Sequence, residues 1–249
     1  MQLYSVREQL PADRRGVLER IAAAGYGAVE PFNILSDPDG LRADLDAAGL
    51  TVCSVHAIPS GEQAADLLSA AKALGASTVI VPHLPPARFA TAESVAEVAS
   101  ELNEMAARTA DAGLRLGYHN HDFELSSIVD GQPALEVLAS SLDEGVLLEV
   151  DTYWAAVGGQ DVPALLGRLG DRVRYLHVKD GPITKQDPMT AVGAGRMPVA
   201  EILAAAPSAE WHIVELDRCA TDMLTAIEQS LQWLASNGLA TPVRGSVAR

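Results

Sequence analysis

The sequence predicts an α/β fold, a single (β/α)8 TIM barrel, from three observations. Short apolar runs alternate with amphipathic helical stretches, eight of each, along nearly the whole chain. The length of 249 residues is typical of one such barrel. No Gly-, Ser- or Pro-rich linker marks a second domain. The rival, an open doubly wound sheet, needs a glycine-rich phosphate turn after its first strand, and Tyr4-Ser-Val-Arg7 is nothing like one. We expect the barrel to occupy residues 1–238, followed by a flexible C-terminal tail at 239–249.

The strand candidates are short runs rich in apolar and β-branched residues, as expected for parallel strands covered on both faces. Polar residues gather at the end of several of these runs. In chain order the predicted strands are Gln2–Val6, Ala28–Pro31, Thr51–His56, Thr78–Pro82, Arg115–His119, Val146–Asp151, Val173–Val178 and Trp211–Glu215.

The helix candidates carry apolar residues on one face, and several are followed by glycine, which readily adopts the left-handed conformation that ends a helix. In the first, Val17, Leu18 and Ile21 share a face and Gly25 follows the last turn. In chain order the predicted helices are Asp13–Ala24, Asp39–Ala48, Glu62–Leu74, Glu93–Ala112, Pro133–Ser140, Val162–Leu169, Pro198–Ala206 and Met223–Asn237.

The stretch from Val146 to Trp154 carries the strongest functional signal. It opens as an apolar strand and then places Glu149 and Asp151 two residues apart, so their side chains leave the same side of the strand. Carboxylates are rarely buried without a partner, so this pair calls for a cation. The alternative is that Asp151 caps the following helix and Glu149 forms a salt bridge.

The composition excludes some classes of function. The formal net charge is −15, from 18 basic and 33 acidic residues, with no basic cluster to offset it, so nucleic acid is not an expected partner. No run of eighteen apolar residues indicates a membrane span, and the early first strand leaves no room for a signal peptide. Two cysteines, Cys53 and Cys219, are too few for a disulfide framework, so we expect a cytoplasmic protein.

Histidines and acidic residues recur at one kind of position, the C-terminal end of a predicted strand. In a TIM barrel these ends meet at one mouth, where active sites of this fold lie. A single histidine there is more often structural, but only His212 among the six lies elsewhere. The mouth residues are His56, His83, His119, His121, Asp151, His177 and Glu215.

Carboxylate and imidazole ligands together suit one divalent metal ion. The oxygen-rich set favours Mn²⁺, while Co²⁺, Mg²⁺ and Zn²⁺ stay possible. Such an ion polarises a carbonyl or hydroxyl group of a sugar-like ligand, and a neighbouring side chain can then remove the adjacent proton. Proton abstraction at carbon is the reaction class that these residues support best.

Several segments resemble the xylose-isomerase-like TIM barrel superfamily, in the group called sugar phosphate isomerases/epimerases. Their order and spacing make the resemblance specific to the superfamily but not to a substrate. They run along nearly the whole chain and are Leu3-Tyr-Ser-Val-Arg7, Gly25-Tyr-Gly-Ala-Val-Glu30, Tyr118-His-Asn-His-Asp-Phe-Glu124, Glu149-Val-Asp-Thr-Tyr-Trp154, Leu176-His-Val-Lys-Asp180, Val192-Gly-Ala-Gly195 and Val214-Glu-Leu-Asp217.

The resemblance implies a metal site at the ends of strands five to eight, with Asp151, His177 and Glu215 as ligands. Many epimerases of the superfamily have a glutamate at the end of strand five, and this chain has His119. Either His119 takes that place, or Glu149 supplies the carboxylate; we favour Glu149 because it restores the charge. The loss of the strand-five glutamate puts a two-glutamate epimerisation in doubt.

We assign provisional roles to the mouth residues. His119, Glu215 and Lys179 are the catalytic candidates, although Lys179 could equally pair with Asp180. The glycine-containing stretch 181–197 is a candidate lid or partner-contact loop. Arg7 and Glu30 are minor candidates for ligand contact. The substrate-binding candidates are His56, His83, His121 and Trp154, and Trp154 is equally compatible with ordinary packing.

The leading functional hypothesis is a metal-dependent isomerase or epimerase of a sugar or keto-sugar, which could be a homo-oligomer. The main alternative is a lyase that removes a β-substituent, as in inosose dehydration or cleavage of a 3-keto-glycoside. An endonuclease IV-like activity on DNA is disfavoured by the charge and by Trp154, which replaces a metal-binding histidine. A non-catalytic carbohydrate-binding barrel is a further alternative.

Overall fold

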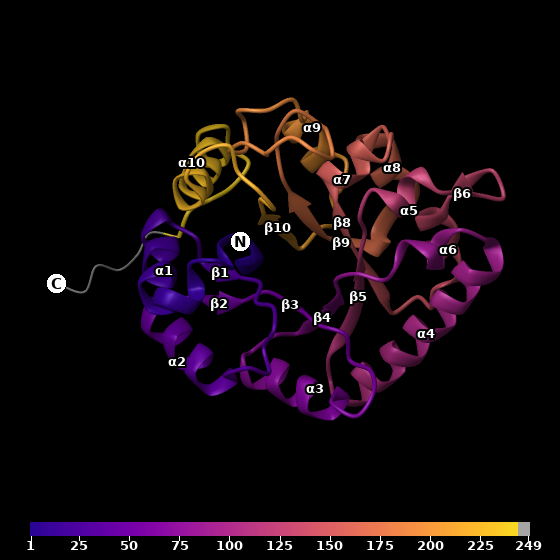
Figure 1. The fold of residues 1–249 in the computed structure, drawn as a ribbon, viewed down its shortest axis with the longest axis horizontal. Helices are drawn as coiled ribbons and strands as arrows, with labels where there is room; N and C mark the ends of the chain where they lie inside the picture. The colour runs from indigo at the N-terminus through magenta and orange to yellow at the C-terminus, as the bar shows by residue number, and fades with distance from the viewer. Residues whose placement is uncertain (244–249) are drawn as a thin grey trace.

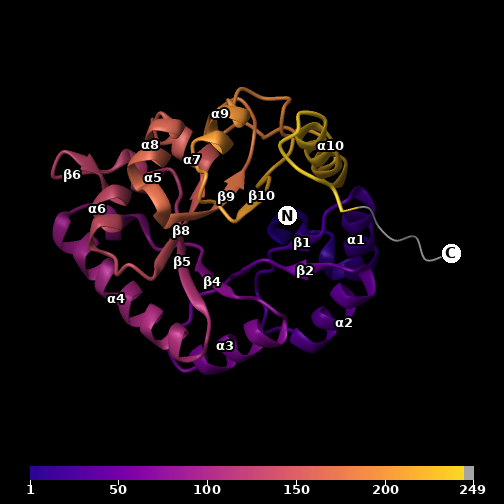
Figure 2. The ribbon, with the colours of Figure 1, turned by 180° about the vertical axis from the view of Figure 1, so that it is seen from behind.

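The structure, a computed structural model that describes residues 1–243, is a parallel β/α barrel, which confirms the predicted fold class. The strands lie in the middle and the helices form an outer ring around them (Figure 1). The same ring is seen from behind, with α1 and α10 side by side (Figure 2). No helix among the described residues is both long and apolar enough to cross a membrane.

Most barrel strands agree with the predicted ones to within a residue. A small hairpin, β6 and β7, lies outside the barrel in the connection from β5 to β8. The strands are β1 Ala28–Val29, β2 Thr51–Val52, β3 Val55–His56, β4 Thr78–Val81, β5 Arg115–His119, β6 Ile128–Val129, β7 Gln132–Pro133, β8 Val146–Asp151, β9 Val173–Val178 and β10 Trp211–Val214.

All eight predicted helices are present, with no end shifted by more than three residues and Val162–Leu169 correct at both ends. Two short helices that the sequence analysis did not single out, α5 and α7, directly follow β5 and β8. The helices are α1 Leu10–Ala24, α2 Pro38–Ala48, α3 Ala64–Ala73, α4 Ala92–Asp111, α5 Phe123–Ser126, α6 Ala134–Ser141, α7 Thr152–Val157, α8 Val162–Leu169, α9 Val199–Ala204 and α10 Met223–Ser236.

The barrel closes through the first residues of the chain. Six parallel strands are paired in the order β10-β9-β8-β5-β4-β3, and β1 pairs with β2. The N–H of Gln2 donates to the carbonyl of Val214 at 3.0 Å, and Gln2 also forms a parallel bridge with Glu30. Phe32 bridges His56 in the same way. Residues 1–2 therefore lie between β10 and the β1 segment.

Two predicted strands differ from the observed ones. Gln2–Val6 is wrong beyond its first residue, because Leu3–Val6 forms a 3-10 helix that begins where the Gln2 side chain accepts a hydrogen bond from the N–H of Tyr4. Thr51–His56 divides into β2 and β3, since it pairs first with β1 and then with β4. Local side-chain capping in the first case, and a change of partner in the second, override the β-rich pattern.

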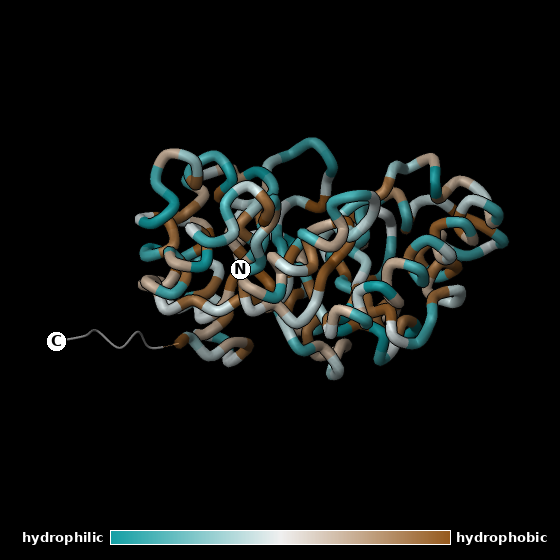
Figure 3. The backbone as a smooth tube through the Cα atoms, turned by 90° about the horizontal axis from the view of Figure 1, so that it is seen from below, coloured by the Kyte–Doolittle hydropathy of each residue, from teal (hydrophilic) through white to brown (hydrophobic). Residues whose placement is uncertain are grey.

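The hydrophobic core has two parts. The larger lies between the strands and the outer helices. The smaller joins side chains from five different strand segments inside the barrel. Hydrophobic stretches run mainly through the middle of the molecule, with hydrophilic ones at its outer turns (Figure 3). The inner group consists of Ala28, Cys53, Ile80, Tyr175 and Ile213, with Leu147 against it.

The segment after α10 is described only in part. Leu239 and Ala240 pack against the large core, and the N–H of Val243 donates to the carbonyl of Gly25 at 2.9 Å. Residues 244–249 lie outside the described part, so the flexible tail at 239–249 stays a prediction.

Candidate metal centre

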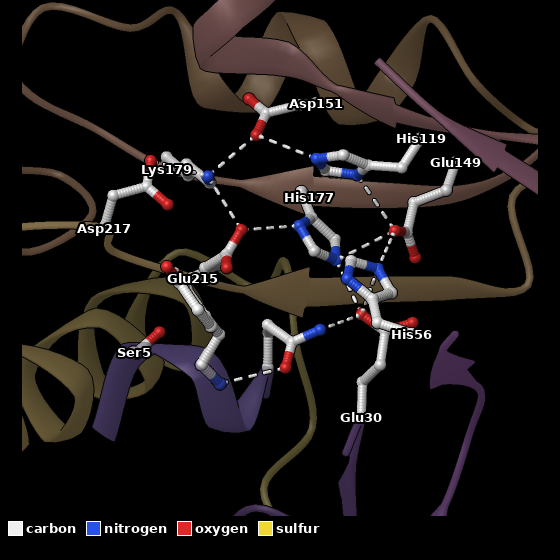
Figure 4. Close-up of polar contacts among 12 residues, drawn as sticks. Ser5, Glu30, His56, His119, Glu149, Asp151, His177, Lys179, Glu215 and Asp217 are labelled. Carbon is white, nitrogen blue, oxygen red and sulfur yellow. Dashed lines mark hydrogen bonds and ion pairs between the residues drawn. The ribbon is translucent and has the colours of Figure 1, made fainter. Parts of the chain in front are cut away.

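The functional side chains are stacked in layers inside the barrel, because every second residue of a strand faces its interior. On β9 the series is Tyr175 in the apolar floor, His177 above it and Lys179 just past the strand end. Figure 4 shows the upper two layers, with side chains from several strands pointing toward one another. The corresponding series are Leu147, Glu149 and Asp151 on β8, and Ile213, Glu215 and Asp217 on and after β10.

The upper layer brings together four residues that could hold a metal ion. One ligand atom from each of His119, Asp151, His177 and Glu215 lies within 4.8 Å of the others, and all four side chains are buried. His177 Nδ1 is 2.7 Å from Glu215 Oε2, and His119 Nε2 is 3.8 Å from Asp151 Oδ2. The three residues carried over from the superfamily thus meet at one place.

The buried ammonium of Lys179 lies among three carboxylates of this layer. Its Nζ is 2.8 Å from Asp151, 2.7 Å from Glu215 and 2.9 Å from Asp217. Burial lowers the pKa of Lys179, but the carboxylates outweigh burial and hold its pKa well above the usual value. Lys179 therefore stays protonated. The alternative from the sequence, a pair with Asp180, is wrong, because Lys179 pairs with Asp151, Glu215 and Asp217 instead.

A lower layer centres on Glu149. Its Oε2 atom lies 2.6 Å from His56 Nε2, 3.0 Å from His119 Nδ1 and 3.2 Å from His177 Nε2. Glu30 Oε2 adds a contact of 2.8 Å to His177 Nε2. Burial lowers the pKa of His177, but Glu149 and Glu215 together raise it well above the usual value. Sequence reasoning undervalued Glu30, whose signal was a carboxylate at the end of an apolar strand.

The two layers divide the predicted ligand set. Glu149 groups with His56, His119 and His177, whereas Asp151 and Glu215 group with His119 and His177. The contact between Glu149 and His119 Nδ1 leaves His119 Nε2 directed at Asp151. A carboxylate that holds one ring nitrogen of a histidine while the other faces a metal is a common supporting arrangement.

The segment Tyr118–Glu124 is fixed by two residues that sequence reasoning did not assign. The Asn120 side chain accepts a hydrogen bond from the N–H of Asp151 at 3.0 Å and donates to its carbonyl at 3.4 Å. The Glu124 carboxylate accepts from the Tyr118 hydroxyl at 2.7 Å and from the N–H of His121 at 2.8 Å. Burial raises the pKa of Glu124 to about 7. Asn120 thus links β5 to β8, and Glu124 positions His121.

Asp151 also caps a helix, the alternative role that the sequence analysis considered for it. Its Oδ1 atom accepts a hydrogen bond from the N–H of Trp154 at 2.8 Å and caps α7, while Oδ2 faces the upper layer. Trp154 Nε1 in turn donates to Asp217 Oδ2 at 3.1 Å. One carboxylate therefore serves both helix and site, and Trp154 fixes Asp217.

The Asp180 side chain organises the loop that follows β9. It accepts hydrogen bonds from the N–H groups of Gly181, Gly193, Gly195 and Met197 at 2.8 to 3.1 Å. A side chain at Gly195 would collide with the Asp180 carboxylate, and Gly193 has a φ of +90°. The glycines of the Val192–Gly195 segment are therefore explained by the backbone, which closely approaches a buried carboxylate.

A cavity of about 300 Å³ opens above the two layers. His83 and His121 lie on one side of it, with ring centroids 5.1 Å apart. His121 Nδ1 is buried and has no hydrogen-bond partner among the described residues. Burial, with the charge of Lys179 second, lowers the pKa of His121 to about 3, so its ring is neutral. The cavity is lined by Tyr4, His56, Pro82, His83, His119, His121, Lys179, Glu215 and Asp217.

Residues 18–237 match the xylose isomerase-like TIM barrel family. The chain belongs to this family. Its fold is similar to two structures from Parabacteroides distasonis, each described as a sugar phosphate isomerase/epimerase. One is 24% identical and has a TM-score of 0.80, covering 97% of this chain and 94% of the other. The second is 20% identical and has a TM-score of 0.84, with 97% and 98% covered.

A curated relative is the inosose dehydratase of Geobacillus kaustophilus, 28% identical over 190 residues. The match covers 66% of this chain and 61% of the length of that protein. Proteins similar to this chain are thus named for isomerase or epimerase activity and for dehydratase activity, and the exact reaction class of this chain is a separate question.

The residues of the upper layer fit a divalent cation. Asp151 Oδ2 is buried and has no hydrogen bond of good geometry among the described residues, although Lys179 Nζ is close. Across both layers five carboxylates face one ammonium and three imidazoles, an excess of negative charge that a divalent ion would offset. The carboxylates are those of Glu30, Glu149, Asp151, Glu215 and Asp217, and the imidazoles those of His56, His119 and His177.

Proposed function

We propose that this chain is a metal-dependent lyase that removes a proton beside the carbonyl of a keto-sugar and expels a β-substituent. The observation that carries the proposal is a pair of groups at one cavity. His121 has a ring nitrogen, Nδ1, without a hydrogen-bond partner among residues 1–243, and Lys179 has an ammonium held by three carboxylates. An imidazole that can accept a proton and an ammonium that can donate one line the same cavity, and these are the two kinds of group that an elimination requires.

In this proposal the metal ligands are His119, Asp151, His177 and Glu215. Two carboxylates and two imidazoles suit Mn²⁺, with Co²⁺ and Zn²⁺ as alternatives and Mg²⁺ less favoured by the imidazoles. The ion, when bound, would polarise the substrate carbonyl and so acidify the neighbouring C–H bond. Glu149 is then a positioning residue that holds His119 through Nδ1.

The protein groups would act on the substrate as follows. His121 takes the proton from the carbon beside the carbonyl, and the electron pair of that C–H bond forms a carbon–carbon double bond. The bond from the β-carbon to its oxygen substituent breaks, and the departing oxygen takes a proton from Lys179. His56 and His83 line the cavity and are placed to bind hydroxyl groups of the sugar.

Isomerisation or epimerisation, the leading hypothesis from the sequence, is the second candidate. A two-base epimerisation is disfavoured because His119 stands in place of the strand-five glutamate and Glu215 is bound to both Lys179 and His177. A one-base isomerisation, in which His121 moves a proton between neighbouring carbons, would use the same residues. The membership of the xylose isomerase-like family favours keeping this candidate.

The test combines metal analysis with product analysis. The purified protein is analysed for bound metals and is then incubated with keto-inositols, keto-sugars and 3-keto-glycosides in deuterated water. Elimination predicts a product lighter by water or by the expelled alcohol. Isomerisation predicts an unchanged carbon skeleton that has gained deuterium. Protein purified without chelators that binds no divalent metal would contradict both.

A matched pair of variants tests the assigned base. His121→Asn removes the proposed proton acceptor, and we expect kcat to fall by about a hundredfold or more. His212→Asn changes the one histidine that lies at the far end of the barrel, at the start of β10, and should leave kcat unchanged. Equal activity of the two variants would remove His121 from the mechanism.

A further inference from the structure

The barrel mouth is asymmetric in its chemistry. The imidazole, ammonium and carboxylate groups of the cavity come mainly from the strands after β4. The rim formed after the first three barrel strands instead exposes large apolar side chains. Tyr4 is 42% exposed and Ile58 is 39% exposed, and Phe32 is half-buried beside Tyr4. A sugar ring accounts for the polar side of the mouth but not for this apolar side.

The apolar side contains a cavity of about 540 Å³, well within the range of small-molecule sites. It is formed by the 3-10 helix at Leu3–Val6, the start of α1 and the loop from β1 to α2, all on the mouth side of the barrel. Its apolar lining residues are Leu3, Leu10, Pro11, Pro31, Phe32, Ile34 and Leu41.

Its polar lining groups are largely occupied by one another. Asp37 pairs with Arg14 at 2.9 Å, and the Ser36 hydroxyl donates to the carbonyl of Asn33 at 3.1 Å. A second sugar in this cavity would leave most of its hydroxyl groups without partners, which is costly. A flat apolar group would instead contact proline, leucine and phenylalanine side chains.

Tyr4 lines the catalytic cavity and contacts Phe32, which lines the apolar one. Its ring packs edge-on against Phe32, with centroids 5.3 Å apart. The Arg7 guanidinium also lies over the Tyr4 ring, 4.2 Å from its centroid, and donates to the carbonyl of Asp217 at 2.9 Å. Arg7 lines the large cavity, and Asp217 lines the catalytic one. A substituent on a sugar in the catalytic cavity could therefore pass over Tyr4 into the apolar cavity.

We infer that the apolar cavity binds the departing group of the substrate, and that this group is an aromatic ring, so that the substrate class is the keto-glycosides of aromatic alcohols. This inference rests on the proposed lyase function and names its substrate class. The bond that breaks joins the sugar carbon β to the ketone and the oxygen of the aromatic alcohol, which leaves with a proton from Lys179.

The test compares two leaving groups of similar strength that differ in the aromatic ring. Benzyl and methyl 3-keto-β-D-glucosides are offered to the wild-type protein, and kcat/KM is measured for each. We expect benzyl to be preferred by about tenfold or more, the usual worth of burying a ring in an apolar pocket. Phe32→Ala, which removes an aromatic wall, and Ser36→Trp, which fills the cavity from its rim, should each lower that preference by about tenfold.

Ile128→Ala is the matched control, because Ile128 is a 62% exposed apolar residue on the β6 hairpin, outside the mouth. It should keep the wild-type preference. Calorimetric binding of unoxidised benzyl β-D-glucoside, which cannot eliminate, measures the cavity without catalysis. Loss of this binding in Ser36→Trp supports the inference even if neither ketone is turned over. The absence of turnover would count against the lyase function alone. Equal use of both ketones by the wild type, or an unchanged preference in both cavity variants, would overturn it.

Discussion

The two ends of the barrel hold charged clusters of opposite character. At the bottom, Glu210 is shared by Arg115 at 2.8 Å and Arg174 at 2.6 Å, and Arg115 also donates to the hydroxyls of Thr78 and Tyr175. These charged side chains are 28 to 38% exposed. Cations outnumber the carboxylate, every group has a partner, and water screens them. Such an arrangement adds modestly to stability and requires no further ligand to balance its charge.

At the mouth the ratio of carboxylates to cations is reversed, and most of the charged side chains are buried. Five carboxylates face one ammonium and three imidazoles, and the side chains of Glu30, Glu149, Asp151 and His177 are fully buried. Burying unbalanced charge costs stability. The excess of buried negative charge at the mouth, beside the balanced cluster at the bottom, supports the proposal that the mouth binds a cation and substrate. The predictions below test this difference between the two ends.

The largest expected effect is that of Asp151→Asn at the mouth. The amide keeps the oxygen that caps α7 but removes the charge that faces the upper layer. We expect turnover to fall by about a thousandfold, since a lost metal ligand forfeits several kcal/mol of transition-state stabilisation. Added Mn²⁺ should raise the Tm of the wild type but not of the variant. A variant that keeps full activity would show that the upper layer is not the metal centre.

Glu149→Gln tests the lower layer and should have a smaller effect. If Glu149 positions His119 from behind, metal affinity falls by about ten- to a hundredfold and activity returns when Mn²⁺ is added in excess. Titration of the metal-free variant, followed by activity, measures both. If Glu149 is itself a ligand, as the sequence analysis favoured, activity should not return at any metal concentration.

The sequence was most informative where one physical pattern dominates. Val146–Asp151 and Val173–Val178 are correct to the residue, because long apolar runs inside a parallel sheet have few alternatives. The placement of Asp151, His177 and Glu215 at the barrel mouth followed from their positions at strand ends, and their choice as ligands followed from the resemblance to the superfamily. In contrast, Gln2–Val6 was wrong because a single side-chain hydrogen bond redirects the chain after Gln2.

The sequence did not predict which site residues share a layer of the barrel. Two residues of one face, such as Glu149 and Asp151, differ by one layer in height, and only the relative stagger of neighbouring strands decides which histidine each one meets. The pairing of β8 with β9 shifts register between Leu148 and Glu149, within the segment that sets this height. No local pattern reports such a shift. The partners of Lys179 and the role of Glu30 depend on it too.

Gly195→Ala should act on the loop beside the mouth with an intermediate effect. The added methyl group collides with the Asp180 carboxylate that holds the loop, so we expect a loss of about 1–3 kcal/mol in the free energy of unfolding and a raised KM. Gly167→Ala is the control, because Gly167 lies inside α8 with open space around it, and alanine should stabilise it by about 0.5–1 kcal/mol. Urea unfolding measures both, and equal shifts would contradict the assigned role of Asp180.

Glu210→Gln at the bottom should have the smallest effect and none on turnover. Hydrogen bonds from Arg115, and then from Arg174, lower the pKa of Glu210 to about 2. Because the folded pKa lies below the usual value near 4.5, the ionised carboxylate stabilises the fold above about pH 4.5, and this contribution is lost as the pH falls toward 2. Screening by water limits it to about 1 kcal/mol. The variant should therefore be less stable than the wild type by about this amount at pH 7, with the gap shrinking below about pH 4.5 in urea titrations. A gap that is independent of pH, or a loss of turnover, would show that the bottom cluster does more than support the barrel.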